Sequence, residues 1–228
     1  MGGQASTRHA SGQEAVVLVD ANNFYASCEA VVDPAVIGRP LVVLSNNDGC
    51  IVSRSAEARA LGIRMGQPYF QVQRQLERQG VIVRSSNYAL YADMSQRLMD
   101  VLEEWMEALE IYSIDEAFGL LHRPGRSSGD LTALGHRLRR DVRRRLGLPV
   151  AVGIAPTKVL AKLANKWAKT APAGGGPLPA VFDLGACPPE QVEAVLEATA
   201  IEDVWGIGKK LSRWCRLRGV AHARALRD

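Results

Sequence analysis

The 228-residue chain has few cysteines, few aromatic residues and no long apolar run. Its four cysteines, Cys28, Cys50, Cys187 and Cys215, form neither a CxxC pair nor a secreted disulfide spacing, so we expect buried or free thiols in a reducing compartment. No stretch approaches the roughly 20 apolar residues that a membrane span needs, and residues 1–13 lack the apolar middle of a signal peptide. These absences predict a cytoplasmic protein with no membrane contact and a disordered tail at 1–13.

Acidic residues are in slight deficit, with 24 Asp and Glu against 28 Lys and Arg, which gives a net charge of +4. Six arginines lie close together, at Arg137, Arg139, Arg140, Arg143, Arg144 and Arg145. Such a cluster fits a solvated helix face or a surface that meets a polyanion, and charge alone leaves both interpretations open.

Apolar runs alternate with helical patterns along the chain. Residues 15–19 form a β-branched run ending at Asp20, which predicts a buried strand with a carboxylate at its end. The other predicted elements are helices at 24–32, 55–62, 67–79, 88–109, 130–146 and from about Thr157, strands at 41–44, 81–84 and 150–155, and a hairpin at 110–121. This order predicts an α/β sheet domain with an insertion at roughly 45–85 and, after a flexible stretch at 171–179, a helical C-terminal module.

Three acidic residues fall at predicted strand ends: Asp20, and Asp115 and Glu116 at the tip of the hairpin. Adjacent strands could bring the three carboxylates to one sheet edge, where they would repel one another unless a cation neutralised them. Hard oxygen ligands of this kind suit Mg²⁺ and favour phosphoryl or nucleotidyl transfer. Strand-end acids are also common as turn or cap residues, so the spacing alone leaves both interpretations open.

Several long motifs resemble the Y-family translesion DNA polymerases. VDANNFYASCE at 19–29 and SIDEAF at 113–118 resemble the two palm motifs, and SNNDGCIVSRSAEARALGIRMG and SSNYALYADMS resemble the UmuC branch. The similarity covers about 15–228 and implies a palm with a mixed sheet and flanking helices, an inserted small fingers subdomain and a helical helix-hairpin-helix thumb. The implied boundaries are palm at 14–44 and 86–182, fingers at 45–85, and a partial thumb at 183–228 with the helix-hairpin-helix at 204–220.

The resemblance assigns roles to the acidic residues. Asp20 and Asp115 would be metal ligands, Glu116 would be the third catalytic carboxylate and a ligand, and the carbonyl of Ala21 would add another oxygen. The implied cofactor is a pair of Mg²⁺ ions, with Mn²⁺ as a substitute. Many family members carry a second acid at the position of Asn22. UmuC-like members have Asn there, as this chain does.

Two aromatic residues follow the first acid. Tyr25 falls where the family keeps a steric gate, a ring that would collide with a ribose 2′-hydroxyl, and Phe24 would support the sugar beside it. The structural alternative is that both rings are core residues of an amphipathic helix.

The resemblance also implies two residues that grip the incoming triphosphate, Arg59 in the fingers and Lys169 in the palm. A guanidinium can donate two parallel hydrogen bonds to phosphate oxygens, and an ammonium supplies a compact positive charge. Ala56 stands where many relatives outside the UmuC branch place a tyrosine that touches the triphosphate. Lys158 and Lys162, one helical turn apart, would face phosphates or the primer strand, although solvated lysines have the same pattern.

The segment VWGIGKKLSRWCRLRGV at 204–220 resembles a helix-hairpin-helix. Gly206 and Gly208 would form a tight turn whose N–H groups meet a DNA phosphate, because only glycine lets the backbone approach closely at the start of a helix. Lys209 and Lys210 would add positive charge there.

The function implied by the resemblance is template-directed addition of dNTPs to a primer 3′-hydroxyl opposite damaged DNA, in the SOS response of a bacterium. The implied partners are primer-template DNA, dNTP, a UmuD′ dimer and RecA. The family's little finger domain has no counterpart before Asp228, so we expect the sliding-clamp contact to be missing as well. An alternative is a catalytic-core fragment that binds DNA or partners without productive synthesis; another palm-type enzyme such as a nucleotide cyclase is disfavoured by SAEARALG and GIGKK.

Overall fold

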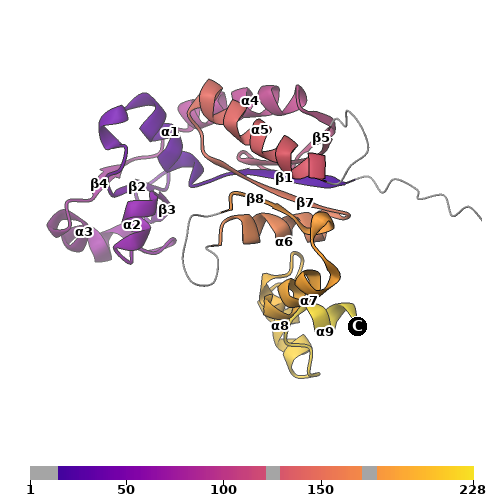
Figure 1. Cartoon of the computed structure of the whole chain (residues 1–228). Coiled ribbons are helices and arrows are strands. Elements are labelled where there is room, and N and C mark those ends of the chain that lie inside the picture. Colours follow the sequence, from indigo (N-terminus) through magenta and orange to yellow (C-terminus); the bar gives the residue numbers. More distant parts are fainter. Residues whose placement is uncertain (1–14, 122–128, 171–178) are drawn as a thin grey trace, which may run out of the picture.

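The computed structural model describes residues 15–121, 129–170 and 179–228. The predicted tail at 1–13, and most of the stretches 123–129 and 171–179, lie outside the described residues. A five-stranded sheet, in the order β5-β6-β1-β7-β8, and a three-stranded sheet, in the order β3-β2-β4, organise the chain (Figure 1). The strands are β1 Val16–Ala21, β2 Leu41–Leu44, β3 Ile51–Arg54, β4 Ile82–Arg84, β5 Met106–Ile111, β6 Glu116–Leu121, β7 Val150–Ala155 and β8 Val181–Asp183. The α-helices are α1 Phe24–Val32, α2 Ala56–Ala60, α3 Tyr69–Arg78, α4 Tyr88–Glu103, α5 Gly129–Leu146, α6 Lys158–Ala168, α7 Pro189–Ala198, α8 Lys209–Arg216 and α9 Ala223–Arg227.

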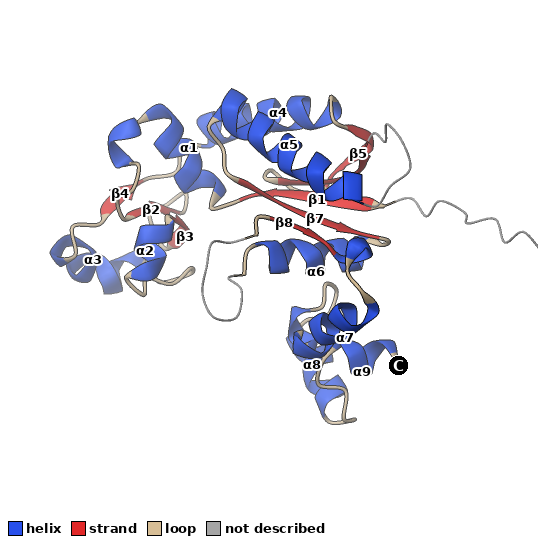
Figure 2. Cartoon of the chain, viewed as in Figure 1, coloured by secondary structure: helices blue, strands red, loops and turns tan. Residues whose placement is uncertain are grey.

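The large sheet separates two helical layers, with α4 and α5 on one face and α6 on the other (Figure 2). The alternation of side chains along β1 produces this arrangement, because successive residues of a strand point to opposite faces. Val17 and Val19 belong to the core shared with α4 and α5, whereas Leu18 packs with Phe118 and α6. The pairings of β1 with β6 and β7 are antiparallel and that of β7 with β8 is parallel, so the predicted mixed sheet is confirmed.

Helix α6 lies unusually close to the sheet. A Cβ atom at Gly153 of β7 would be 2.2 Å from the backbone nitrogen of Asn165 and 2.3 Å from the carbonyl oxygen of Ala161. The side-chain amide of Asn165 donates to the carbonyls of Leu18 (3.3 Å) and Ala151 (2.9 Å). Glycine and this buried amide therefore fix α6 against β1 and β7, and with it the lysines that α6 carries.

The inserted segment folds around the three-stranded sheet. Strand β2 pairs antiparallel with β3 and parallel with β4, so residues 41–44 belong to this sheet and not to the large one. The prediction that residues up to 44 belong to the large-sheet domain and that the insertion begins at residue 45 is therefore wrong for residues 41–44. The short helix predicted at 55–62 is confirmed as α2, where the Ser55 side chain accepts a hydrogen bond from the Ala58 N–H (3.2 Å).

One predicted helix was too long, and two strands were not predicted. The helix expected at 88–109 ends at Glu103, and β5 begins at Met106. The apolar spacing continues to Trp105, but pairing of Met106 with Leu121 on β6 competes successfully with the helix. Strands β3 (IVSR) and β8 (VFD) each contain two apolar residues followed by a polar residue, so neither forms an apolar run like the LVVL of β2.

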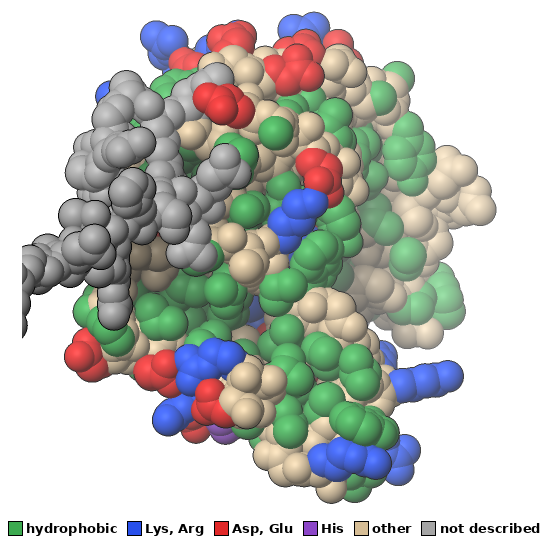
Figure 3. Space-filling model, turned by 90° about the vertical axis from the view of Figure 1, so that its right-hand side faces the viewer, with side chains coloured by type: hydrophobic (Ala, Val, Ile, Leu, Met, Phe, Trp, Pro, Cys, Tyr) green, Lys and Arg blue, Asp and Glu red, His purple; other side chains and the backbone are tan. Residues whose placement is uncertain are grey.

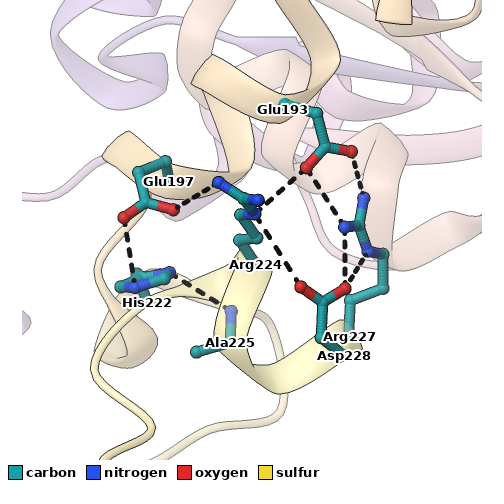
Figure 4. Close-up of polar contacts among 7 residues, drawn as sticks. All are labelled: Glu193, Glu197, His222, Arg224, Ala225, Arg227 and Asp228. Atoms are coloured by element: carbon teal, nitrogen blue, oxygen red, sulfur yellow. Dashed lines mark hydrogen bonds and ion pairs between the residues drawn. The ribbon is translucent and has the colours of Figure 1, made fainter. Parts of the chain in front are cut away.

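The C-terminal module lies beneath α6 in Figure 1 and is tied together by charge. Arg227 forms ion pairs with both oxygens of Glu193 on α7 (2.5 and 3.1 Å), and Arg224 reaches Glu193 and Glu197 (3.2 and 3.4 Å; Figure 4). His222 contacts Glu197 through Nε2 and accepts the Ala225 N–H through Nδ1. These contacts hold the last helix, α9, against α7.

Two expectations drawn from absences can be compared with the structure. All four cysteines are free thiols, two of them buried, as predicted. Across residues 15–121, 129–170 and 179–228, no helix is both long and apolar enough to cross a membrane.

Candidate active site

The three predicted acidic residues come together where β1 and β6 pair. Asp20 and Glu116 are direct cross-strand partners, and the N–H of Ala21 donates to the carbonyl of Asp115 (2.9 Å). Asp115 occupies the turn between β5 and β6, where its carboxylate accepts a hydrogen bond from the Ser113 hydroxyl (2.7 Å). The expected meeting of distant carboxylates at one sheet edge is therefore observed, while their catalytic roles stay predictions.

Lys162 of α6 and Lys169, the residue that caps the C-terminal end of α6, reach this acidic group. The Lys169 ammonium lies 2.6 Å from Oδ1 of Asp20, and that of Lys162 lies 2.5 and 2.8 Å from the two oxygens of Glu116. Burial raises the pKa of Asp20, Lys169 lowers it, and the nearby Asp115 and Glu116 raise it, with a net result above the usual value. The site therefore combines three acids with two cations in a partly buried space.

The donor chemistry of this group fits a hard divalent cation, since carboxylate oxygens are the ligands that Mg²⁺ prefers. Burial is the main cause of the raised pKa of Asp20, and the smaller contribution, repulsion by Asp115 and Glu116, is the kind that a bound cation relieves. In this structure the carboxylates of Asp20 and Glu116 form ion pairs with lysines. Among the described residues, no three His, Cys, Asp or Glu side chains are arranged so that they could hold a metal ion. Asn22 does not line the cavity beside Asp20 and Asp115, and its Oδ1 is buried without a hydrogen-bond partner in the described part of the chain.

A cavity of about 550 Å³ opens beside the acids, between the large sheet and the insertion. Asp20 and Asp115 line it from the sheet, and Arg54 and Arg59 line it from the insertion. The Arg54 guanidinium donates to the carbonyl of Ile63, and its pKa is lowered by burial and by the positive charge of Arg59. Two cations thus lie close together facing two carboxylates, an arrangement that suits a polyphosphate held beside a metal site.

Sequence reasoning identified Arg59 but missed Arg54. The signal available for Arg54 was its place at the end of the IVSR run, which the structure shows to be β3. Arg54 lines the cavity because it is the last residue of β3, and the end of this strand faces the cavity.

The two aromatic residues after Asp20 have different environments. Phe24 is 4% exposed and belongs to the core, as the alternative of a core residue on an amphipathic helix predicts. Its ring also lines the cavity. Tyr25 is half-buried and lines the cavity beside Asp115. Burial raises the pKa of the Tyr25 phenol, with smaller contributions from Tyr88 and Asp115, which keeps that ring neutral.

Lys158 and Lys162 of α6 make further contacts. Lys158 pairs with Glu110 of β5. The ammonium of Lys162 lies over the ring of Tyr112 (4.4 Å) and near that of Trp205 (5.7 Å), in addition to its contact with Glu116. Both lysines lie on the same helix, as predicted, and their contact with DNA stays a prediction.

The predicted hairpin of the C-terminal module forms the turn before α8. Gly206 has φ +92°, a conformation that only glycine adopts readily, and Gly208 is the N-cap residue of α8. Lys209 and Lys210 are exposed in the first turn of that helix. Figure 3 shows Lys and Arg side chains at the rim of the C-terminal module, with hydrophobic side chains gathered between them.

Comparison with solved structures defines the class of fold. The chain superposes on the structure titled "Insertion ternary complex of Dbh DNA polymerase" with a TM-score of 0.75 and 26% identity, covering 91% of this chain and 58% of that one. A Y-family DNA polymerase chimera of Dbh and Dpo4 gives the same values. The large sheet with its helices, and the inserted small sheet, thus correspond to a Y-family palm and fingers.

The chain belongs to the impB/mucB/samB family, whose model matches residues 19–166. Protein UmuC of Salmonella typhimurium is 47% identical over 210 residues, which is 90% of this chain and 47% of that protein. Protein ImpB of the same organism is 45% identical over 207 residues, 89% of this chain and again 47% of the relative. The chain therefore spans about half the length of the curated relatives it matches.

Proposed function

We propose that this chain carries the catalytic core of a translesion DNA polymerase, which adds dNTPs to a primer 3′-hydroxyl opposite damaged template. One observation carries the proposal: a single cavity joins Asp20 and Asp115 to the cations Arg54 and Arg59 and to the Tyr25 ring. Carboxylates beside cations fit a triphosphate whose α-phosphorus is attacked by the primer oxygen, so that the bond to the β-phosphate breaks and pyrophosphate leaves.

Each group has a distinct task in this reaction. Asp20, Asp115 and Glu116, with the carbonyl of Ala21, would hold two Mg²⁺ ions. When bound, these ions activate the attacking hydroxyl and neutralise charge on the leaving group. Arg59, with Arg54 near it, would hold the triphosphate in the orientation needed for in-line attack.

The remaining predicted contacts complete the proposal. Lys169 would exchange its carboxylate partner for the triphosphate, and Tyr25, supported by Phe24, would exclude a ribose 2′-hydroxyl. Lys158, Lys162 and the hairpin before α8 would contact DNA. The damage-response role, with a UmuD′ dimer and RecA as partners, rests on resemblance to the UmuC branch and is part of the same proposal.

Primer extension by Asp115→Ala tests the assignment. We expect the wild-type chain to extend a primer in the presence of Mg²⁺ and dNTPs, and the folded variant to lose this activity. Asp93→Asn on α4 is the control, because Asp93 is an exposed acid that pairs with Arg97 and does not line the cavity. Extension at the wild-type rate by folded Asp115→Ala contradicts the proposal, and DNA binding without any extension by the wild type favours a binding core.

A further inference from the structure

A second cavity, of about 580 Å³, lies along α1. Ala26 and Ala30, one turn apart on this helix, line it, whereas Tyr25, on the other side of the helix, lines the cavity beside the acids. The segment after α1 supplies Ile37, a large aliphatic side chain that is nevertheless 60% exposed. Leu146, at the end of α5, also lines this second cavity. Most of its lining is apolar, and it is named here the α1 groove.

The α1 groove continues into the arginine cluster of α5. Arg143 lines both the groove and an open hollow of about 670 Å³ beside Trp105. The two surfaces meet because the end of α5 lies next to α1 (Figure 1). Only two acids, Glu57 and Asp141, are among the described residues that line the groove and the hollow. All six arginines of the cluster line one or the other and form the arginine face: Arg137, Arg139, Arg140, Arg143, Arg144 and Arg145.

Part of the positive charge of the arginine face has no partner. Arg137 and Arg140 are exposed and form no hydrogen bond or ion pair within the part of the chain that the structure describes. The Asp141 carboxylate is already in use, because it accepts the Trp105 N–H (3.1 Å) and pairs with Arg144 (2.8 Å). Like charges held side by side repel one another until an anion binds between them. A solvated helix face, the alternative that charge alone left open, does not account for arginines that line a hollow and adjoin an apolar groove.

Both surfaces are separate from the residues proposed to contact DNA. Helix α5 covers one face of the large sheet, whereas α6 with Lys158 and Lys162 covers the other, and the C-terminal module lies on the α6 side (Figure 2). The described lining of the cavity beside Asp20 includes none of the six arginines. The proposed contacts with primer and template therefore leave the α1 groove and the arginine face free for a different partner.

We propose that the α1 groove and the arginine face together bind an acidic segment of a partner protein, whose apolar side chains enter the groove while its carboxylates pair with the arginines. The excess of arginine over acid selects a partner of negative charge. The groove selects protein over nucleic acid, because aliphatic walls are stabilised by burying apolar side chains, which a phosphate backbone lacks.

Two further observations favour a protein partner. Surfaces that bind single-stranded nucleic acid add exposed aromatic rings on which bases stack. No aromatic side chain is among the described residues of the α1 groove, and the Trp105 ring of the hollow packs against the core. Arginine is enriched and lysine depleted at protein interfaces, and α5 carries its whole positive charge on arginine. This inference does not depend on the proposed polymerase activity.

Selection from a random peptide display library, with the 228-residue chain as the target, tests the inference. We expect enrichment of peptides in which one or two large apolar residues adjoin several acidic residues. Selected peptides, synthesised with a fluorescent label, are then titrated with the wild type and with variants by fluorescence anisotropy. Circular dichroism verifies that each variant is folded.

Two variants examine the two parts of the surface. Ile37→Ser should weaken peptide binding about fivefold through the loss of one apolar wall of the groove. Arg137→Gln combined with Arg140→Gln should weaken it about tenfold at low salt. Between about 0.05 and 0.5 M NaCl the wild type should lose affinity, and the double arginine variant should lose much less, because screening acts on the charges that it lacks.

Each variant has a matched control. Leu217→Ser removes a large aliphatic side chain that is 78% exposed in the C-terminal module, outside the groove and the hollow. Arg74→Gln combined with Arg78→Gln removes the same charge from α3, at exposed positions that line neither surface. Both controls should bind the selected peptides as the wild type does.

Three results overturn the inference. The first is a selection that enriches no peptides with adjoining apolar and acidic residues. The second is wild-type affinity of the selected peptides for folded Ile37→Ser and for the double arginine variant, which would place their binding elsewhere. The third comes from a labelled oligothymidylate titrated with the same proteins: strand binding that needs Arg137 and Arg140 but not Ile37, without acidic peptides in the selection, would assign the arginine face to nucleic acid.

Discussion

The Lys169 ammonium, at the end of α6, lies 2.6 Å from the Asp20 carboxylate on β1. One residue predicted to grip a triphosphate therefore contacts a predicted metal ligand directly. Lys162 and Glu116 repeat the pattern on the same helix. The two lysines offset part of the negative charge of the site. Each is predicted to contact phosphate, of the triphosphate or of the primer strand, and could move to it when its carboxylate binds a cation.

Replacing Asp20 by Asn should stabilise the chain near neutral pH. Burial raises the pKa of Asp20, so the folded state favours the protonated acid more than the unfolded state does. Stability of the wild type should therefore fall as pH rises from the usual Asp range through the raised pKa, whereas Asp20→Asn lacks this loss.

Urea unfolding of the metal-free chain from about pH 4 to pH 7 measures the difference. The gain from Asp20→Asn should be largest near pH 7 and shrink toward the acidic end, where the pH approaches the usual Asp pKa of 3.8 and the unfolded state also becomes protonated. Asp93→Asn, which removes an exposed acid paired with Arg97 on α4, controls for the loss of one charge. A gain of equal size at both ends of the range contradicts the prediction.

Much of the fold was predictable because local pattern and tertiary packing agree. The β-branched run ending at Asp20 and the acidic tip of the hairpin are strong local signals, and β1 pairs with β6 as they require. The same reasoning failed at 104–109, where helical spacing persists beyond Glu103 while β5 obtains its hydrogen bonds from β6. Pairing with a distant strand decides whether such a segment is helix or strand, and the sequence of the segment alone does not indicate its pairing partner.

The candidate site shows the same limit. Carboxylates and Arg59 belong to recognisable motifs, whereas Arg54 and Tyr91 gain their positions from packing between segments distant in sequence. Glu29 and Tyr91, which hydrogen-bond to each other, are 62 residues apart in the chain. Spacing along one helix could indicate each residue's face, but not which other helix that face meets.

Gly153→Ala should loosen the site through α6. A methyl group there would lie 2.2 to 2.8 Å from backbone atoms of α6, which have no freedom to move individually. We expect a loss of about 1–3 kcal/mol in the free energy of unfolding, and weaker nucleotide binding because Lys162 and Lys169 move with the helix.

Chemical denaturation and nucleotide titration check these two effects. Gly49→Ala is the control, since a Cβ there would meet only the Ser45 hydroxyl at 3.6 Å, an ordinary contact. Unchanged stability in Gly153→Ala would show that α6 tolerates displacement from β7.

Trp205→Ala should release the C-terminal module from the palm. Its ring lies 5.5 Å from that of Tyr112 and 5.8 Å from that of Phe118, and its indole N–H donates to the Tyr112 hydroxyl at 3.3 Å. Loss of two ring contacts should destabilise the docked arrangement by about 1–3 kcal/mol. Hydrogen exchange in α8 and α9 should accelerate accordingly.

Trp214→Ala provides the matched comparison for the loss of an indole. Trp214 is 51% exposed on α8, and its ring is covered by Arg218, with the guanidinium carbon 3.9 Å from the ring centroid. We expect little change in exchange from this variant. Equal acceleration by both substitutions argues against a docking role for Trp205.

The two hairpin glycines should respond differently to alanine. Gly206 has φ +92°, so Gly206→Ala should lower stability by about 1–2 kcal/mol through backbone strain. Gly208 lies outside the positive-φ region, and a Cβ there would meet no atom within 4 Å, so Gly208→Ala should lower stability only by the cost of alanine at an N-cap, about 0.5–1 kcal/mol. If the backbone of this turn meets a DNA phosphate, the added methyl group at residue 208 should weaken primer-template binding by about tenfold, roughly the effect of one charge-assisted hydrogen bond. Fluorescence anisotropy at fixed salt, beside a thermal melt of each variant, separates the two effects, and wild-type DNA affinity in Gly208→Ala would show that the turn does not approach phosphate through this residue.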